Sequence, residues 1–364
     1  MADVQTLVLA PPQPAPSAPR LGRFSAYFGT PGNTLVSVLS IAAILFVAKL
    51  AFGWLVADAV FSGGGETCKA ASGACWPFVA QKLRYMLFGF YPYDEQWRPM
   101  LALALLFGAF LFSVMPRFWS RGLLLAWILV VLPVLYILMA GGIFGLTPVA
   151  TTSWGGLPLS FMLSFVGLTL AMPLGIVLAL ARASNLPAIR ILAVGFIEIV
   201  RGVPLISILF MATVMLPLFM PEGVTIDKLL RAQVAIILFA SAYIAEIVRG
   251  GLQDVPAGQY EAGSSLGLHY WQVMRKIVLP QALKKVIPPM VSLFIGFFQD
   301  TTLVTIVGLV DFLDTVRSAI RDPEWQGIAV LEGYLVAAAV YFTFSALMGA
   351  YSRFLEKHFR TTHA

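Results

Sequence analysis

Two acid–base pairs lie within long apolar runs of this sequence. Glu198 precedes Arg201 by three residues, and Glu246 precedes Arg249 by the same spacing. Charges inside a membrane cost about 2.5–3.5 kcal/mol each on insertion scales, so each needs a partner or a water-filled cavity. Residues at i and i+3 share one helix face, so each pair could neutralise itself. Alternatively, these groups contact the ammonium and carboxylate of a substrate, or gate its exit.

A third polar group lies in a separate apolar run, at about 286–307. Asp300 is followed by Thr301 and Thr302 and has no basic residue three or four positions away. An unpaired carboxylate at membrane depth is typical of a site that recognises a ligand ammonium, with hydroxyl groups as adjustable partners. The alternative is a hydrogen bond between helices.

The composition identifies the setting of these charges. Of 364 residues, 59% are apolar and only 12% are charged, whereas a soluble domain carries about 25% charged residues. Long apolar runs without strand-like alternation predict helices that span a membrane. The expected fold is all-α, with eight spans at about 35–57, 99–115, 122–144, 158–181, 189–218 (bent near Pro204), 232–250, 286–307 and 329–351.

The distribution of charge predicts the orientation of these spans. Basic residues gather in alternate short connections and at both ends, at Arg20, Arg23, Arg117, Arg121, Arg182, Arg190, Arg275, Lys276, Lys284, Lys285, Arg353, Lys357 and Arg360. Cytoplasmic loops collect Lys and Arg, so both termini are expected in the cytoplasm. The net charge of +6 then records orientation, and no basic block indicates nucleic-acid binding.

Outside the spans, the chain offers little chemistry of its own. Residues 1–34 are rich in Pro and are expected to form a disordered tail; they are no signal peptide, because the first apolar run is too long. The external loop 61–98 holds Cys68 and Cys75, which form either a disulfide or two free thiols. No metal-ligand spacing and no catalytic set is present, so we expect no metal site and no enzyme.

The connection 250–285 carries the most specific pattern. We expect a two-turn helix from Gln259 to Leu266, with Glu261 in its first turn and a left-handed Gly267 ending it. Ala262 and Gly263 have small side chains, so the groove of another protein could approach this helix closely. Leu266 and Leu268 are expected apolar anchors for such a partner. A second helix, Tyr270 to Leu283, would return to the membrane with a bend at Pro280.

This connection resembles the signature loop of binding-protein-dependent ABC importer permeases. The family pattern is matched at Glu261, Ala262, Gly267, Ile277, Leu279 and Pro280. Gly263 departs from it, since the family has Ala there, and lowers helix propensity by about 1 kcal/mol. The resemblance implies that Glu261, Ala262, Gly263, Gly267 and Leu268 contact a separate ATPase. The chain has no phosphate-binding loop, so ATP and Mg are expected on that partner, with no cofactor on this chain.

Three further segments resemble the polar amino acid permeases; they begin at Glu198, Ser241 and Phe298. This resemblance covers about residues 155 to 355 and implies a five-helix type I ABC importer core. The preceding helices resemble those of the longer general L-amino acid permeases. The implied domains are the tail 1–34, three transmembrane helices in 35–150, the core with its coupling loop in 151–355, and a cytoplasmic tail 356–364.

The expected function is therefore that of a multi-pass permease subunit in the bacterial inner membrane. By this resemblance, it pairs with a second homologous permease, a dimeric ABC ATPase and a periplasmic amino-acid-binding protein, and moves L-amino acids into the cytoplasm among membrane lipid. The alternatives are an ion-coupled secondary transporter, an ABC permease for another small polar solute, and a scaffold that conducts nothing.

Overall fold

The computed structural model describes residues 27–115 and 120–361. The chain divides into two units, one of Met1–Val60 with Ala70–Ala74 and one of Phe61–Lys69 with Cys75–Ala364, and each is described by itself. In the first unit, helix α2 (Pro31–Phe52) continues into a π-helix, Gly53–Ala57. It begins at Pro31 rather than near residue 35, because proline is well suited to the first helical turn.

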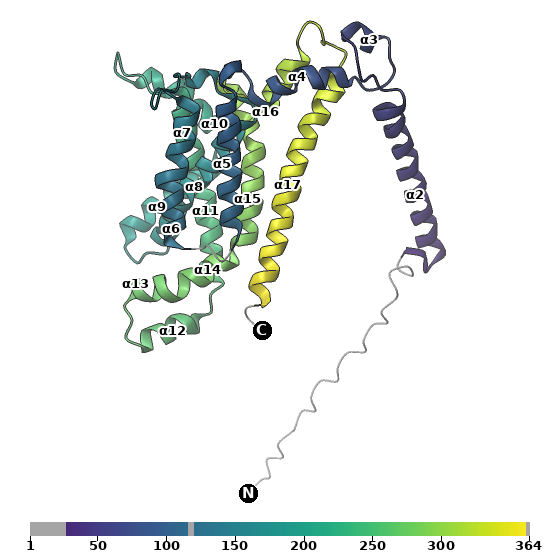
Figure 1. The fold of residues 1–364 in the computed structure, drawn as a ribbon. Coiled ribbons are helices and arrows are strands. Elements are labelled where there is room, and N and C mark those ends of the chain that lie inside the picture. Colours follow the sequence, from purple (N-terminus) through teal and green to yellow (C-terminus); the bar gives the residue numbers. More distant parts are fainter. Residues whose placement is uncertain (1–26, 116–119, 362–364) are drawn as a thin grey trace. The chain divides into compact units, whose positions relative to one another are not determined.

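The second unit is a bundle of helices (Figure 1). Its apolar helices are α5 (Trp97–Val114), α6 (Arg121–Ala126), α7 (Leu132–Ala140), α8 (Gly156–Arg182), α9 (Pro187–Gly202), α10 (Leu205–Phe210), α11 (Lys228–Gln253), α15 (Ile287–Asp300) and α17 (Val330–Thr361). The all-α class is thus confirmed, and in the described part of the chain the one strand, Val310–Asp311, has two residues.

The predicted count of eight spans is not confirmed. Among the described residues, six helices are long and apolar enough to cross a membrane, and a bent helix pair raises the number to seven. Trp127–Ala140 is a shorter apolar helix. The bent pair is Pro187–Gly202 with Leu205–Phe219, and its angle is 102°. This angle confirms the bend predicted near Pro204. The helix breaks there because proline disfavours helical geometry in the residue before it.

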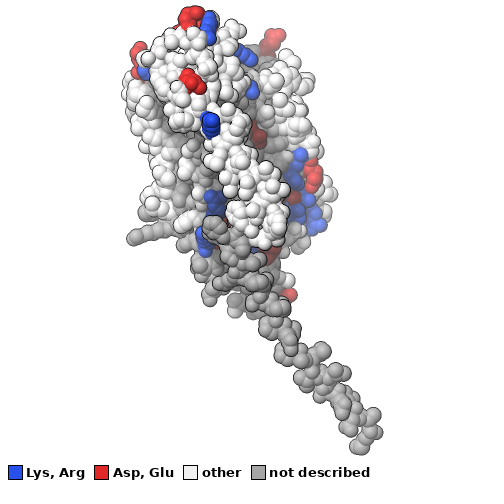
Figure 2. Space-filling view, turned by 90° about the vertical axis from the view of Figure 1, so that its right-hand side faces the viewer, with Lys and Arg blue, Asp and Glu red and all other residues white. Residues whose placement is uncertain are grey.

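The packing of the bundle depends on small and aromatic side chains. A Cβ on Gly175 of α8 would lie 2.4 Å from Ile244 Cγ2 of α11, so these helices approach closely, as small residues allow in membranes. Elsewhere in the bundle, the rings of Phe161, Phe298 and Phe344 pack against one another, with ring centroids 4.2–5.2 Å apart. Figure 2 shows a face on which most side chains carry no charge, which suits contact with lipid.

Helix α4 (Trp76–Phe88) lies across one end of the bundle, beside α16 (Phe312–Ile320) (Figure 1). Thr315 Oγ1 donates to the Met86 carbonyl at 2.6 Å, and Lys82 Nζ lies 2.7 Å from Asp322 Oδ2. Cys68 and Cys75 form a disulfide, which decides between the two alternatives left open above. We call this region the α4 end.

The opposite end of the bundle carries α12 (Ala257–Ser265), α13 (Tyr270–Val273), a π-helix (Met274–Val278) and α14 (Leu279–Lys285) (Figure 1). We call this region the α12 end. Gly267 has a φ of +71°, which confirms the left-handed residue after the first helix. The expectation for Glu261 is wrong, since α12 starts at Ala257 and its first turn contains no acidic residue.

Candidate functional site

Five charged side chains form a cluster where α8, α9 and α11 meet. Glu246 of α11 lies at its centre, and its side chain is only 14% exposed. Its carboxylate oxygens lie 2.6 Å from Arg182 Nη1, 2.9 Å from Arg249 Nη2 and 3.6 Å from Arg201 Nη1. The fifth member, Glu198, lies 2.9 Å from Arg182 Nη1. Thus one partly buried carboxylate forms ion pairs with residues at the ends of three helices.

The two predicted i,i+3 pairs have different outcomes. The Glu246–Arg249 pair is confirmed. In the described part of the chain, Glu198 forms its ion pair with Arg182 of α8, so the expected Glu198–Arg201 pair is wrong. Sequence reasoning had used Arg182 only as a marker of orientation; its place at the end of an apolar run was the one available signal.

A cavity of about 570 Å³ opens beside this cluster. Arg201 and Asp300 both line it, together with Gly202, Tyr243, Phe239, Ser292, Leu293, Gly296 and others. The Arg201 guanidinium lies 5.4 Å from the centre of the Tyr243 ring, a distance suited to a cation–π contact. Among the described residues, none forms a hydrogen bond or ion pair with Asp300. The cavity therefore presents one cation and one uncompensated carboxylate.

The other predicted pathway residues lie away from this cavity. Thr301 is buried, and its hydroxyl donates to the Phe298 carbonyl at 2.8 Å. Thr302, Glu198 and Glu246 do not line the cavity either. Asp300 is the last residue of α15, and the chain continues as a 3-10 helix, Thr301–Val307. Residues one and two positions apart on a helix do not share a face, so the two threonines point away from the surface that Asp300 lines.

The signature loop presents its small helix outward at the α12 end. Glu261 and Ala262 are exposed, and Leu266 and Trp271 are 76% and 67% exposed. Leu268 packs against the core instead, so only Leu266 of the two expected anchors is free for a partner. Sequence reasoning missed Trp271, although large apolar side chains on a surface often mark an interface.

Gly263 is the buried exception in α12. A Cβ at this position would lie 2.8 Å from Val273 Cγ2 and 3.2 Å from Ile277 Cδ1. These two side chains belong to the helical segment on which α12 rests. The departure from the family's alanine is therefore explained by packing within this chain, where no room exists for a methyl group.

A second cavity, of about 730 Å³, lies between α12 and the charge cluster. Arg182 and Arg249 line it from the cluster, and Tyr260 and Glu261 line it from α12. Arg249 Nη1 also donates to Gln253 Oε1 at 2.9 Å. The cluster thus adjoins both the first cavity and the signature loop.

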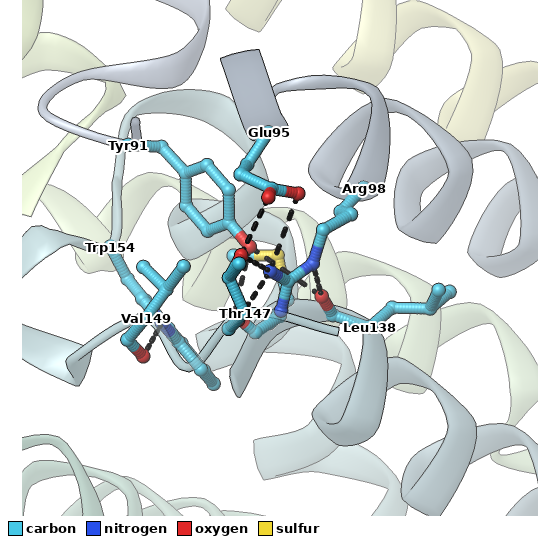
Figure 3. A network of polar contacts seen from close by, with 8 residues as sticks. Tyr91, Glu95, Arg98, Leu138, Thr147, Val149 and Trp154 are labelled. Atoms are coloured by element: carbon cyan, nitrogen blue, oxygen red, sulfur yellow. Dashed lines mark hydrogen bonds and ion pairs between the residues drawn. The ribbon is translucent and has the colours of Figure 1, made fainter. Parts of the chain in front are cut away.

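A second arginine-centred network lies at the α4 end (Figure 3). Arg98 is fully buried, and its guanidinium donates to the carbonyls of Leu138 and Thr147, each at 2.7 Å. Glu95 Oε2 lies 3.6 Å from Arg98, and Glu95 Oε1 accepts from Thr147 Oγ1 at 2.5 Å. Beside it, burial raises the pKa of Tyr91 to about 12. This network joins α5 to the end of α7, and sequence reasoning did not find it.

Within the described ranges, no group of His, Cys, Asp or Glu side chains is arranged to hold a metal ion. The polar groups of the candidate site are instead arginines and carboxylates. Such groups bind and release charged ligands, and they also join helices through ion pairs.

Comparison with known proteins assigns the chain to a family. The profile of the binding-protein-dependent transport system inner membrane component matches residues 171–361. The chain is 46% identical to the inner membrane amino-acid ABC transporter permease protein YhdY of Escherichia coli K12, over 92% of this chain and 91% of that protein. The chain therefore belongs to the family of binding-protein-dependent transport system inner membrane components, which are multi-pass membrane subunits.

Two further similarities bear on the architecture. The chain is 35% identical to the glutamate/glutamine/aspartate/asparagine transport system permease protein BztC of Rhodobacter capsulatus, over 99% of this chain and 98% of that one. A crystal structure of an amino acid ABC transporter with histidines is 30% identical, has a TM-score of 0.50, and is matched over 56% of this chain and 92% of its own. The type I ABC importer fold expected for the core is thus confirmed.

Proposed function

We propose that this chain is the permease subunit of an ATP-driven importer that moves L-amino acids from a periplasmic binding protein into the cytoplasm. The observation that carries this proposal is the cavity lined by both Arg201 and Asp300. The names of YhdY and BztC support the substrate class. Family membership favours this function over an ion-coupled secondary transporter.

The charges of the cavity suit a zwitterion. The Arg201 guanidinium can bind an α-carboxylate through two parallel hydrogen bonds. Asp300, which has no partner among the described residues, can accept the α-ammonium group. A volume of about 570 Å³ falls within the usual range for small-ligand sites.

The α12 surface is the proposed contact with a dimeric ABC ATPase. Glu261, Ala262 and Leu266 are exposed there, and an exposed apolar side chain such as Leu266 can anchor a helix in the groove of a partner. ATP and Mg would bind that partner, with no cofactor on this chain. Alternating access follows if the ATPase holds α12 with different affinity in its ATP-bound and ATP-free states.

The charge distribution supports the orientation. Arg275, Lys276, Lys284 and Lys285 all belong to the α12 end, which would therefore face the cytoplasm together with both termini. The α4 end would then face the periplasm, where the binding protein docks. The remaining proposed partners are a second, homologous permease and the surrounding lipid. We propose to divide the chain at the boundaries 1–34, 35–150, 151–355 and 356–364.

Reconstitution of the complete complex tests this function. Wild-type vesicles should accumulate labelled L-amino acids only with ATP and binding protein, whereas uptake driven by an ion gradient without the ATPase would refute the proposal.

Asp300→Asn should weaken substrate affinity about tenfold or more while the complex still assembles, because a charged hydrogen bond to the ammonium is lost. The control is Glu356→Gln, an exposed substitution in α17 that does not line the cavity.

The coupling surface needs a separate experiment. Glu261→Lys and Gly267→Asp should abolish co-purification of the ATPase, since one reverses a charge on the contact surface and the other strains a residue with a φ of +71°. Recovery of a full complex with normal uptake would contradict the assigned surface.

A further inference from the structure

Arg201 belongs to two sites at once. It lines the cavity that holds Asp300, and its Nη1 lies 3.6 Å from Glu246 Oε2. The two other arginines of the cluster lie closer to Glu246, Arg182 at 2.6 Å and Arg249 at 2.9 Å. The contact with Arg201 is therefore the longest of the three and the easiest to exchange, since ion-pair energy falls with distance.

The cluster also has one cation more than it has anions. Three guanidinium groups (Arg182, Arg201, Arg249) face two carboxylates (Glu198 and Glu246). Glu198 forms its ion pair with Arg182. A single added carboxylate would balance the cluster, and the cavity allows one to approach from the Arg201 side.

We propose that Glu246 and the α-carboxylate of the substrate compete for Arg201. This inference rests on the proposed function. Without substrate, the ion pair between Glu246 of α11 and Arg201 of α9 connects these two helices. When the substrate carboxylate binds Arg201, this ion pair breaks, and Glu246 remains paired only with Arg182 and Arg249.

The Arg201–Glu246 ion pair lies between the break that follows α9 and the second cavity, so its loss can affect both. Arg201 is the penultimate residue of α9, immediately before the 102° break between α9 and α10. On its other side, Glu246 contacts Arg249, which lines the second cavity together with Glu261 of α12. Occupancy of the first cavity thereby changes the charge balance beside the coupling surface, through contacts that differ between two states.

The test is equilibrium binding to the purified membrane complex of both permeases and the ATPase, without the binding protein, which would itself retain an amino acid. The probe is whichever labelled L-amino acid wild-type complex retains from a mixture of the twenty. Glu246→Gln should tighten its binding about fivefold, because a competing ion pair of ordinary strength is removed. Glu246→Asp is the second variant: the shorter side chain should lose the 3.6 Å contact first and should also tighten binding.

Three comparisons separate competition from other causes. Glu198→Gln removes the same charge from the same cluster but not from Arg201, so its effect should be clearly smaller. The α-carboxamide of the same amino acid has no carboxylate, so Glu246→Gln should not tighten its binding. In an Arg201→Ala background, Glu246→Gln should change affinity less than twofold, as a double-mutant cycle requires of coupled residues.

The outcomes distinguish this inference from the function on which it rests. If the wild-type complex retains no amino acid, the proposed function fails. If it retains one and neither Glu246 variant tightens binding, or Glu198→Gln acts equally strongly, the competition is overturned while the function stands. Loss of structure cannot imitate the expected result, because damage weakens binding rather than strengthening it.

Discussion

Two arginine-centred clusters in this protein use the same side chain in different ways. Arg98, at the α4 end, is fully buried and donates mainly to backbone carbonyls (Figure 3). Arg182, in the cluster beside the α12 end, is partly exposed and pairs with two carboxylates. Backbone carbonyls move only when the main chain itself moves, whereas side-chain carboxylates can exchange partners. The contacts of Arg98 are therefore suited to a fixed structure, and those of Arg182 to a change of partners.

The surroundings of the two clusters extend this contrast. The α4 end also carries the disulfide between Cys68 and Cys75, and Glu332 accepts from the Cys75 amide at 2.7 Å. Beside the other cluster lie two cavities of about 570 and 730 Å³. Helices can shift only where space and exchangeable contacts are both present, so we expect motion to be concentrated at the α12 end.

The largest expected effect comes from Arg98. Arg98→Met should lower the free energy of unfolding by about 3–5 kcal/mol, because buried carbonyls and the Glu95 carboxylate lose their partner. Denaturant titration in detergent measures it. The control is Arg84→Met, whose exposed side chain bonds Gln96 and the Tyr93 carbonyl; its cost should stay below about 1 kcal/mol. Equal losses would remove the distinction between locked and solvent-exposed arginines.

Asp311 offers a pH test of the α4 end. Burial raises the pKa of this carboxyl to about 6, so the folded protein favours its protonated form. Its stabilising contribution is present below the unfolded pKa of about 4 and is lost as pH rises through 6. Asp311→Asn, whose amide oxygen can still accept from one of the backbone amides of Leu313 and Asp314, should remove about 2 kcal/mol of this pH dependence.

Unfolding of both proteins at pH 4 and pH 7 is the measurement. The stability of Asp311→Asn relative to wild type should increase over that range. A constant difference would mean that the carboxyl titrates at its ordinary pKa, and that burial at this end of the bundle is less complete than the geometry indicates.

Arg182 provides the matching test of the exchangeable cluster. Arg182→Gln should lower the free energy of unfolding by only about 1–2 kcal/mol, because water reaches this side chain and Glu246 keeps two other arginines. Transport should fall far more than stability, since the tie between α8 and α11 is lost. If the variant is as unstable as Arg98→Met, the cluster is a structural lock and the contrast fails.

The smallest effect is expected in α12. Gly263→Ala should lower the free energy of unfolding by about 1 kcal/mol, although alanine favours helices, because its methyl group would meet Val273 Cγ2 at 2.8 Å. Gly258→Ala is the matched control in the same helix; a Cβ there meets nothing within 4 Å, so it should stabilise slightly. Thermal unfolding together with ATPase co-purification measures both, and a stabilising Gly263→Ala would contradict the packing argument.

Much of the architecture followed from local patterns in the sequence. Long apolar runs predicted membrane helices, because backbone groups in lipid must bond within their own segment. Pro204 predicted the break between α9 and α10, since proline restricts the residue before it. Gly267 predicted the end of α12, since glycine readily adopts a left-handed conformation. The number of spans did not follow, because Trp127–Ala140 is apolar but short.

The partners of charged groups were decided by tertiary structure. Helical spacing correctly paired Glu246 with Arg249, since both lie on one helix face. It could not show that Arg182 comes closer to Glu198 than Arg201 does, because that distance depends on how α8 packs against α9. For the same reason, the Arg98 network remained hidden until α5 and α7 were seen together.

The sequence by itself determined that this protein is a membrane permease, because composition and a spaced motif are properties of the chain. Only the tertiary structure decided that Arg201 and Asp300 share a cavity, that Glu246 lies beside Arg201, and that Gly263 has no room for a methyl group. These are distances between helices remote in sequence, and they are set by packing rather than by local preference.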